Sequence, residues 1–177
     1  MRIYSTQLLL ALSAGGLLSL AACQSIEQGT GQKASATLDS KSGSQVKGEV
    51  SFIWQGHDVL INGKFSGLKS DSEQGFHVHE KGDCSAPDAT SAGGHFNPEA
   101  KMHGMPDSGM NHAGDLPNIK SDANGNATYT AKLHGFSVST GPNGIVGRSV
   151  VVHRDPDDYK SQPAGNSGPR IACGLIK

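Results

Sequence analysis

The sequence predicts an all-β protein, namely an eight-stranded Greek-key sandwich or barrel of the immunoglobulin-like type with long loops. Three observations lead to this fold class. Apolar residues alternate with polar ones in several short runs, which is the period of a half-buried strand. The 177 residues include 24 Gly and 8 Pro, a composition that favours tight turns over long helices. No segment sustains the 3.6-residue period of a helix.

The strands follow from this alternation, which begins near Ala36. One side of an extended run carries Val46, Val50 and Phe52, together with Gly48 and Trp54, and the next run carries Val59, Ile61, Gly63 and Phe65 on one side. Gly56 lies in the short link between these runs, so we expect adjacent antiparallel strands. Further strands are expected at residues 76–80, 127–133, 149–153 and 171–176.

The composition indicates one domain and says little about macromolecular partners. Apolar residues make up 35% of the chain, enough for a single core. Fifteen basic residues against 16 acidic ones give a net charge of -1, which gives no indication of a nucleic-acid partner. We expect one domain at residues 36–177. Residues 81–118 have little strand character, and an irregular stretch of this length usually serves a function.

The N-terminus has the features of an export signal. An apolar stretch from Leu8 to Leu20 follows Arg2 and is too short to span a bilayer. Leu-Ala-Ala-Cys at residues 20–23 resembles the bacterial lipobox, which predicts a signal peptide at residues 1–22, lipidation of Cys23 and a flexible tether at residues 23–35. Gln24 favours the outer membrane, so we expect a lipid-anchored protein of the cell envelope or periplasm. An ordinary secretory signal with an incidental Cys is the alternative.

Two cysteines remain after Cys23. Because an exported protein encounters an oxidising compartment, a disulfide between Cys84 and Cys173 is the favoured interpretation. Two reduced, buried cysteines are the alternative.

Histidines are the main functional lead. His77 and His79 are expected to project from the same face of an extended run, where one metal ion can bind both. Further donors follow in the irregular stretch and at the end of a later strand: His95, His103, His112, Asp115 and His153.

These seven residues fit two metals. Four imidazoles suit Cu(II), whereas three imidazoles and a carboxylate suit Zn(II). Two complete sites need eight donor atoms, so one histidine would serve both metals through its two ring nitrogens. A single zinc site with unrelated surface histidines is the alternative. His57 and His134 lie outside the pattern and are interpreted as surface residues.

Four motifs resemble those of copper/zinc superoxide dismutases. Residues 75–85 (GFHVHEKGDCS) resemble the copper-binding motif of that family, and residues 165–176 (GNSGPRIACGLI) resemble its C-terminal motif with an active-site arginine and the second disulfide cysteine. Residues 93–98 (GGHFNP) and 114–118 (GDLPN) are similar to its zinc loop. The resemblance covers residues 36–177 and implies the family's metal-binding and electrostatic loops.

The resemblance assigns a role to each donor. It implies that His77, His79 and His153 bind copper, that His95 bridges the two metals, and that the zinc ligands besides His95 are His103, His112 and Asp115. It implies that Asp157 links His77 to His103 from outside the ligand sets, as such carboxylates commonly orient metal-bound imidazoles.

The resemblance also implies an activity, the dismutation of superoxide through Cu(II)/Cu(I) cycling. Arg170 would attract the anion, His95 would carry a proton, and Lys160 is a candidate steering charge. Pro169 departs from the family pattern beside Arg170. A copper-binding or delivery protein of the same fold is the main alternative. A zinc hydrolase is a second alternative, but this sequence lacks the spare Glu in a His-Glu-x-x-His arrangement that such an enzyme would use. The sequence is compatible with a monomer or a homodimer.

Overall fold

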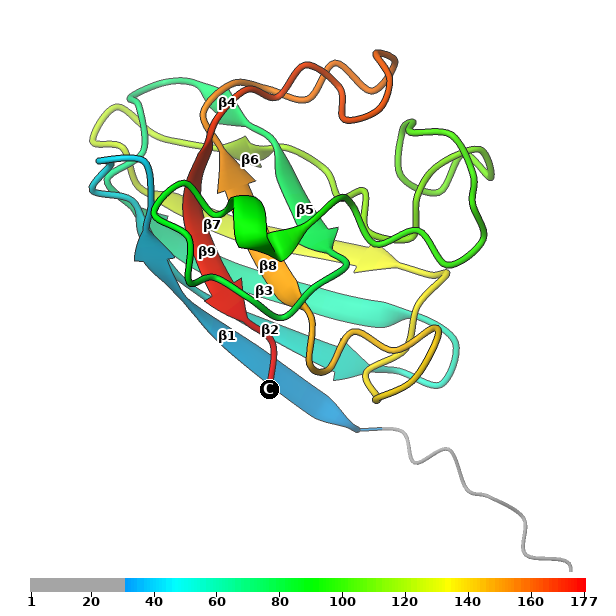
Figure 1. Cartoon of the computed structure of the whole chain (residues 1–177). Coiled ribbons are helices and arrows are strands. Elements are labelled where there is room, and N and C mark those ends of the chain that lie inside the picture. The colour runs from blue at the N-terminus through cyan, green and yellow to red at the C-terminus, as the bar shows by residue number, and fades with distance from the viewer. Residues whose placement is uncertain (1–30) are drawn as a thin grey trace, which may run out of the picture.

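The computed structural model describes residues 31–177, and its regular secondary structure is almost entirely β (Figure 1). The nine strands within these residues are β1 (Lys33–Ser40), β2 (Lys47–Trp54), β3 (Val59–Ser66), β4 (Glu73–Gln74), β5 (Phe76–His79), β6 (Ile119–Lys120), β7 (Ala127–Leu133), β8 (Ser149–His153) and β9 (Arg170–Leu175). One 3-10 turn, η1 (Thr90–Ala92), lies in the long connection between β5 and β6.

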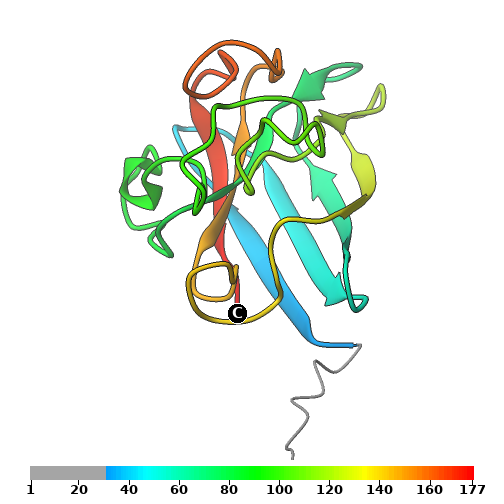
Figure 2. The same cartoon turned by 90° about the vertical axis from the view of Figure 1, so that its right-hand side faces the viewer.

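Seven strands form a single antiparallel sheet in the order β5-β8-β9-β1-β2-β3-β7, and β4 pairs with β6 in a separate ribbon. The sheet curls into a half-barrel, as the orthogonal view in Figure 2 shows. This architecture confirms the all-β prediction. In the described residues, no helix is long and apolar enough to cross a membrane.

The predicted alternation places one side of each strand in the core. Val50 and Phe52 of β2 and Val59 and Ile61 of β3 are buried, and the two strands pair antiparallel as expected. Phe65 occupies space that two glycines leave open: a Cβ on Gly48 or Gly63 would lie 2.5 or 2.7 Å from its ring. Phe65, Phe76 and Tyr129 then pack edge to face, with Phe76 5.2 Å from the Tyr129 ring centroid.

Strand β5 is buried on both faces, which connects the core to the histidines. Phe76 and Val78 are in the hydrophobic core, whereas His77 and His79 face the opposite way and are also fully buried. The long connection after β5 folds back across it, because Val78 N donates to Gly114 O and Val78 O accepts from Phe96 N (2.9 and 2.8 Å). A Cβ on Gly114 would overlap Val78 O, so glycine permits this crossing.

Two details differ from the sequence prediction. β1 begins at Lys33, three residues before the expected domain boundary, because Lys33 and Ala34 pair with Ile53 and Phe52 of β2. β4 and β6 have two residues each, too few for an alternation to be recognised. The predicted signal peptide, Cys23 and most of the predicted tether lie outside the described residues.

Candidate metal centre

The structure brings all seven predicted donors together and buries them. Their ligand atoms form two groups of four, each within 4.8 Å: one group is His77, His79, His95 and His153, and the other is His95, His103, His112 and Asp115. His95 belongs to both groups.

Asp115 stands at the centre of the second group. Its Oδ1 lies 2.8 Å from His95 Nδ1, 3.0 Å from His103 Nδ1 and 3.3 Å from His112 Nδ1. Donor atoms around a tetrahedral ion with bonds of about 2.0–2.1 Å are separated by about 3.3 Å. Three nitrogens and one oxygen at these spacings therefore fit a zinc ion.

The first group contains nitrogens only. His79 Nε2 and His153 Nε2 lie 3.3 Å apart, and the rings of His77 and His95 lie with their centroids 3.9 Å apart and their planes tilted by 30°. Two buried nitrogens, His77 Nδ1 and His95 Nε2, have no hydrogen-bond partner. A buried polar atom without a partner is costly unless an ion occupies the position it faces, so this group fits a metal with nitrogen ligands such as copper.

Asp157 joins the two groups from outside. Its Oδ2 accepts from His77 Nε2 at 2.7 Å and its Oδ1 from His103 Nε2 at 2.9 Å, with all three side chains fully buried. These bonds leave the Nδ1 atom of each ring free to face a metal. Asn118 fixes this carboxylate in turn, because its Oδ1 accepts from Asp157 N and its Nδ2 donates to Asp157 O, both at 3.0 Å.

The other two histidines of the first group are held by main-chain carbonyls. His79 Nδ1 donates to Gly93 O and His153 Nδ1 donates to Gly168 O, each at 3.0 Å. Both rings thereby present Nε2 to the interior of the site. Gly168, which precedes Pro169, has a positive φ of 72°, a conformation that glycine adopts readily.

Comparison with known proteins places this arrangement in a family. Residues 46–176 match the family model for copper/zinc superoxide dismutase (SODC). The chain belongs to this family. It is 40% identical to superoxide dismutase (Cu-Zn) 2 of Aquifex aeolicus (strain VF5) over 168 residues. This alignment covers 93% of this chain and 95% of the relative.

Two further comparisons also cover most of the chain. Superoxide dismutase (Cu-Zn) 2 of Brassica juncea is 44% identical over 151 residues, or 81% of this chain and 96% of the relative. A crystal structure of the clock protein EA4 superposes with a TM-score of 0.74 at 41% identity and covers 84% of this chain and 95% of that one. Copper and zinc are therefore the metals of this superoxide dismutase family member, and its two donor groups fit them.

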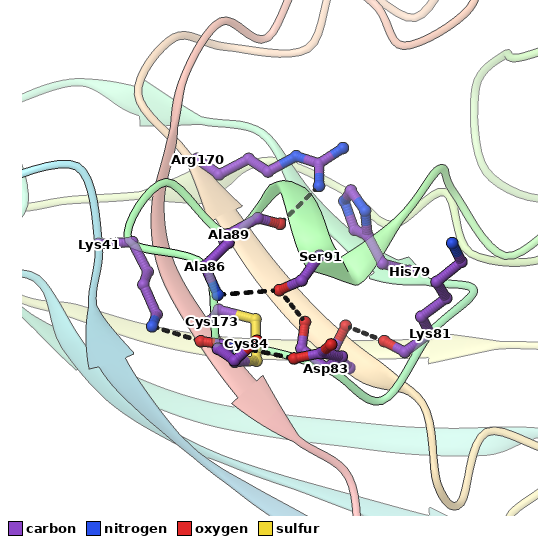
Figure 3. Close-up of a disulfide and its surroundings, with 12 residues drawn as sticks. Lys41, His79, Lys81, Asp83, Cys84, Ala86, Ala89, Ser91, Arg170 and Cys173 are labelled. Atoms are coloured by element: carbon purple, nitrogen blue, oxygen red, sulfur yellow. Dashed lines mark hydrogen bonds between the residues drawn. A yellow bond between two sulfur atoms is a disulfide. The ribbon is translucent and has the colours of Figure 1, made fainter.

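The disulfide predicted from the sequence is present. Cys84 in the loop after β5 is bonded to Cys173 in β9, with Cα atoms 5.8 Å apart (Figure 3). The loop is also held by Lys41, which donates to Cys84 O, and by Ser91 Oγ, which donates to Asp83 O at 2.9 Å.

Arg170 starts β9 and reaches over this loop, as Figure 3 shows. Its Nη1 donates to Ala89 O at 2.7 Å and its Nη2 to Gly93 O at 2.6 Å. Gly93 O therefore accepts from both Arg170 and His79, which fixes the guanidinium beside the first metal-binding group. The side chain is only partly buried, so its charge stays accessible to a solute.

Protonation differs between the two groups. Burial and neighbouring imidazoles lower the pKa values of His79 and His153 well below the usual range, and burial and His77 lower the pKa of His95 to about 4. These rings are therefore neutral and able to bind a metal at neutral pH. His103 differs: burial opposes its charge, but Asp115 and Asp157 outweigh burial and raise its pKa to about 9.

The remaining sequence predictions concern the surface. His57 and His134 are exposed, as expected. Lys160 is also exposed, in the loop between β8 and β9. Sequence reasoning missed the role of Asn118, although this residue ends one of the family motifs, because its contact with Asp157 spans 39 positions.

Gly165 provides a test of the Asp157 contacts. A Cβ at this position would overlap Asp157 Oδ1 and lie 2.7 Å from His103 Nε2. We expect Gly165→Ala to displace the carboxylate and weaken metal binding about 10- to 100-fold, as measured by competition with chelators. Gly43→Ala is the matched control, because Gly43 has a similar positive φ of 74° but no atom within 4 Å of its Cβ position. Equal metal affinity in the two variants would contradict the role assigned to Asp157.

The raised pKa of His103 predicts a pH dependence of zinc binding to the metal-free protein. Below about pH 9 the His103 ring is protonated, and zinc must displace that proton. The apparent zinc association constant should therefore fall about tenfold per pH unit as the pH decreases from about 9 to about 7. Competition titrations against a chelator would measure this. Asp157→Asn removes one source of the shift and should move the dependence to lower pH; an unchanged profile would contradict the assignment.

Proposed function

We propose that this protein is a superoxide dismutase that converts two superoxide anions and two protons into one oxygen and one hydrogen peroxide molecule. The observation that carries this proposal is the position of His95, whose two ring nitrogens face two different groups of donors. A zinc site alone would not explain why a second group of four imidazoles, which shares His95, lies beside it. A ring shared between a nitrogen-only group and a carboxylate-containing group matches the two metals of the family.

The donors divide as the resemblance implies. His77, His79, His95 and His153 would hold copper, and His95, His103, His112 and Asp115 would hold zinc. Bound copper would supply one-electron chemistry between Cu(II) and Cu(I), whereas zinc has no redox chemistry and would help to hold His95 in position. Asp157 keeps His77 and His103 in the orientations that both sites need.

Arg170 binds and orients the substrate. Superoxide carries one negative charge, and a guanidinium held by two carbonyls offers its remaining N–H groups to an anion at a fixed position. Burial lowers the pKa of Arg170, but an arginine remains charged at neutral pH. Lys160 adds a positive charge on the neighbouring loop, which would attract the anion from a distance.

His95 handles a proton. Its Nδ1 contacts Asp115 on the zinc side, whereas its Nε2 faces the copper side without a hydrogen-bond partner. We assign to Nε2 the proton that is delivered to the reduced substrate. The second proton would come from solvent.

The first experiment is a dismutation assay with metal analysis. We expect the copper- and zinc-loaded protein to dismute superoxide and His153→Ala, which removes one of four copper donors, to lose copper and activity while retaining zinc. Full occupancy of both metals without turnover in the parent would instead indicate a copper-binding or delivery protein.

A second pair of variants tests the arginine. Arg170→Ala should lower kcat/KM about tenfold without loss of copper, whereas Arg154→Ala should change it by less than about twofold. Arg154 is the matched control because it is an exposed arginine paired with Asp155 at 2.9 Å. Equal effects of the two substitutions at several salt concentrations would contradict a specific role for Arg170.

We also propose that the enzyme acts in the cell envelope, anchored through a lipid on Cys23, and removes superoxide that arises outside the cytoplasm. The Cys84–Cys173 disulfide supports an oxidising compartment, where such bonds persist. Gln24 after the lipidated Cys favours the outer membrane.

Expression of the full-length chain tests the anchor. Cys23→Ser should release the protein from the membrane fraction into the soluble fraction, and mass spectrometry should show loss of the lipid from the N-terminal peptide. Thr30→Ala serves as the control, because it changes a residue of the same N-terminal segment without removing the cysteine of the lipobox. Membrane association that persists in Cys23→Ser would contradict the proposal.

A further inference from the structure

Three methionines gather on one exposed loop. Apart from Met1, the chain contains only Met102, Met105 and Met110. These side chains are 56%, 57% and 63% exposed, although methionine normally packs in protein interiors. The core of the described residues is built without methionine, so packing does not account for these three.

Met105 and Met110 lie on a loop that is closed at its base, and Met102 precedes this loop in the sequence. Asp115 Oδ2 accepts from Gly104 N at 3.2 Å and from His112 N at 2.8 Å. Gly104 also lies directly against the backbone of Met110, since a Cβ there would be 2.5 Å from Met110 O. The segment from 104 to 112 is thus a small closed loop, part of the green connection that projects from the sheet in Figure 1.

The interior of this loop is a tight turn. Ser108 N donates to Met105 O at 3.1 Å, and Met110 N contacts Ser108 Oγ at 3.4 Å. Small or polar residues occupy positions 107–109, so the methionine side chains are the only large apolar groups that the loop exposes. Met102 precedes His103 at the base, where the two ends of the loop meet.

Thioether sulfur is a soft ligand that prefers Cu(I) over zinc, calcium or magnesium. Two such sulfurs on a small closed loop, with a third just before it, supply the donors for a monovalent soft ion. Flexible methionine side chains can converge on an ion without a change in the backbone.

We propose that Met102, Met105 and Met110 form a surface site for monovalent copper, separate from the buried centre. The site adds a binding function to the proposed dismutase activity and does not depend on turnover. Its ligands are the three sulfur atoms. The exposed imidazoles of His57 and His134 lie 6.0 Å apart, and Asp107 of the same loop contacts His134 at 3.3 Å, but the site does not require them.

The test measures copper binding by the holoprotein, in which the buried groups already hold their metals. Under anaerobic reducing conditions with bicinchoninate as a competitor, we expect about one additional Cu(I) per chain. A triple variant, Met102→Leu with Met105→Leu and Met110→Leu, preserves size and should bind this ion at least about tenfold more weakly. Unchanged zinc content and an unchanged thermal unfolding midpoint would show that the variant is folded.

A second variant distinguishes sulfur from imidazole ligands. His57→Gln combined with His134→Gln should leave the additional Cu(I) in place. Loss of the ion in this variant, or its retention in the methionine variant, would overturn the proposal. Failure of the dismutase assay would leave this result unaffected, because the copper count is independent of activity.

Silver provides a direct view of the ligands, because Ag(I) resembles Cu(I) and does not change its oxidation state under these conditions. In protein labelled with ¹³C in the methionine methyl groups, the signals of Met102, Met105 and Met110 should all shift on addition of one equivalent of Ag(I). Signals that remain in place would contradict a thioether site.

Discussion

The buried carboxylate of Asp157 is the interaction on which the metal centre depends. It accepts a hydrogen bond from one histidine of each donor group, and all of the partners are shielded from water. A charge in such surroundings is tolerated only when it is fully paired, and removal of one partner of a buried pair typically costs about 3–5 kcal/mol. The same pairing that stabilises the charge fixes the two rings, so the stability of this region and the geometry of the donors have a common origin.

Rigid strands position one part of the site and irregular backbone positions the other. His77, His79 and His153 lie on paired strands whose opposite faces pack in the core, so their placement follows from the sheet. Among the donors in the loop, His95 and Asp115 are supported by isolated bridges to β5. Asp115 also binds main-chain N–H groups with one oxygen while it faces three imidazoles with the other. A carboxylate ligand therefore organises the loop as well as the ion.

The sequence predicts the long strands and the seven donors because each has a local pattern. Alternation is visible over eight residues, as in β2 and β3, and histidines are rare enough for a group of them to stand out. Other features have no local pattern. The carbonyl of Gly93, which joins His79 to Arg170, is a main-chain atom, and its role depends on the fold alone. The exposure of the three methionines could not be predicted either, because nothing in the sequence shows that the core packs without them.

The place of β9 in the sheet has a consequence for the order in which the protein folds. This strand lies between β8 and β1, and Lys177 exchanges two main-chain hydrogen bonds with Ser35 near the start of β1. The sheet is therefore completed by pairing strands that are far apart in the sequence, as in the pairs Asp39 with Cys173 and Ser40 with Ala172. Contacts between such distant residues form slowly, because a long stretch of chain must first lose its conformational freedom. Until β9 docks, one edge of β1 has no partner, and an unpaired strand edge of this kind is a site where chains aggregate.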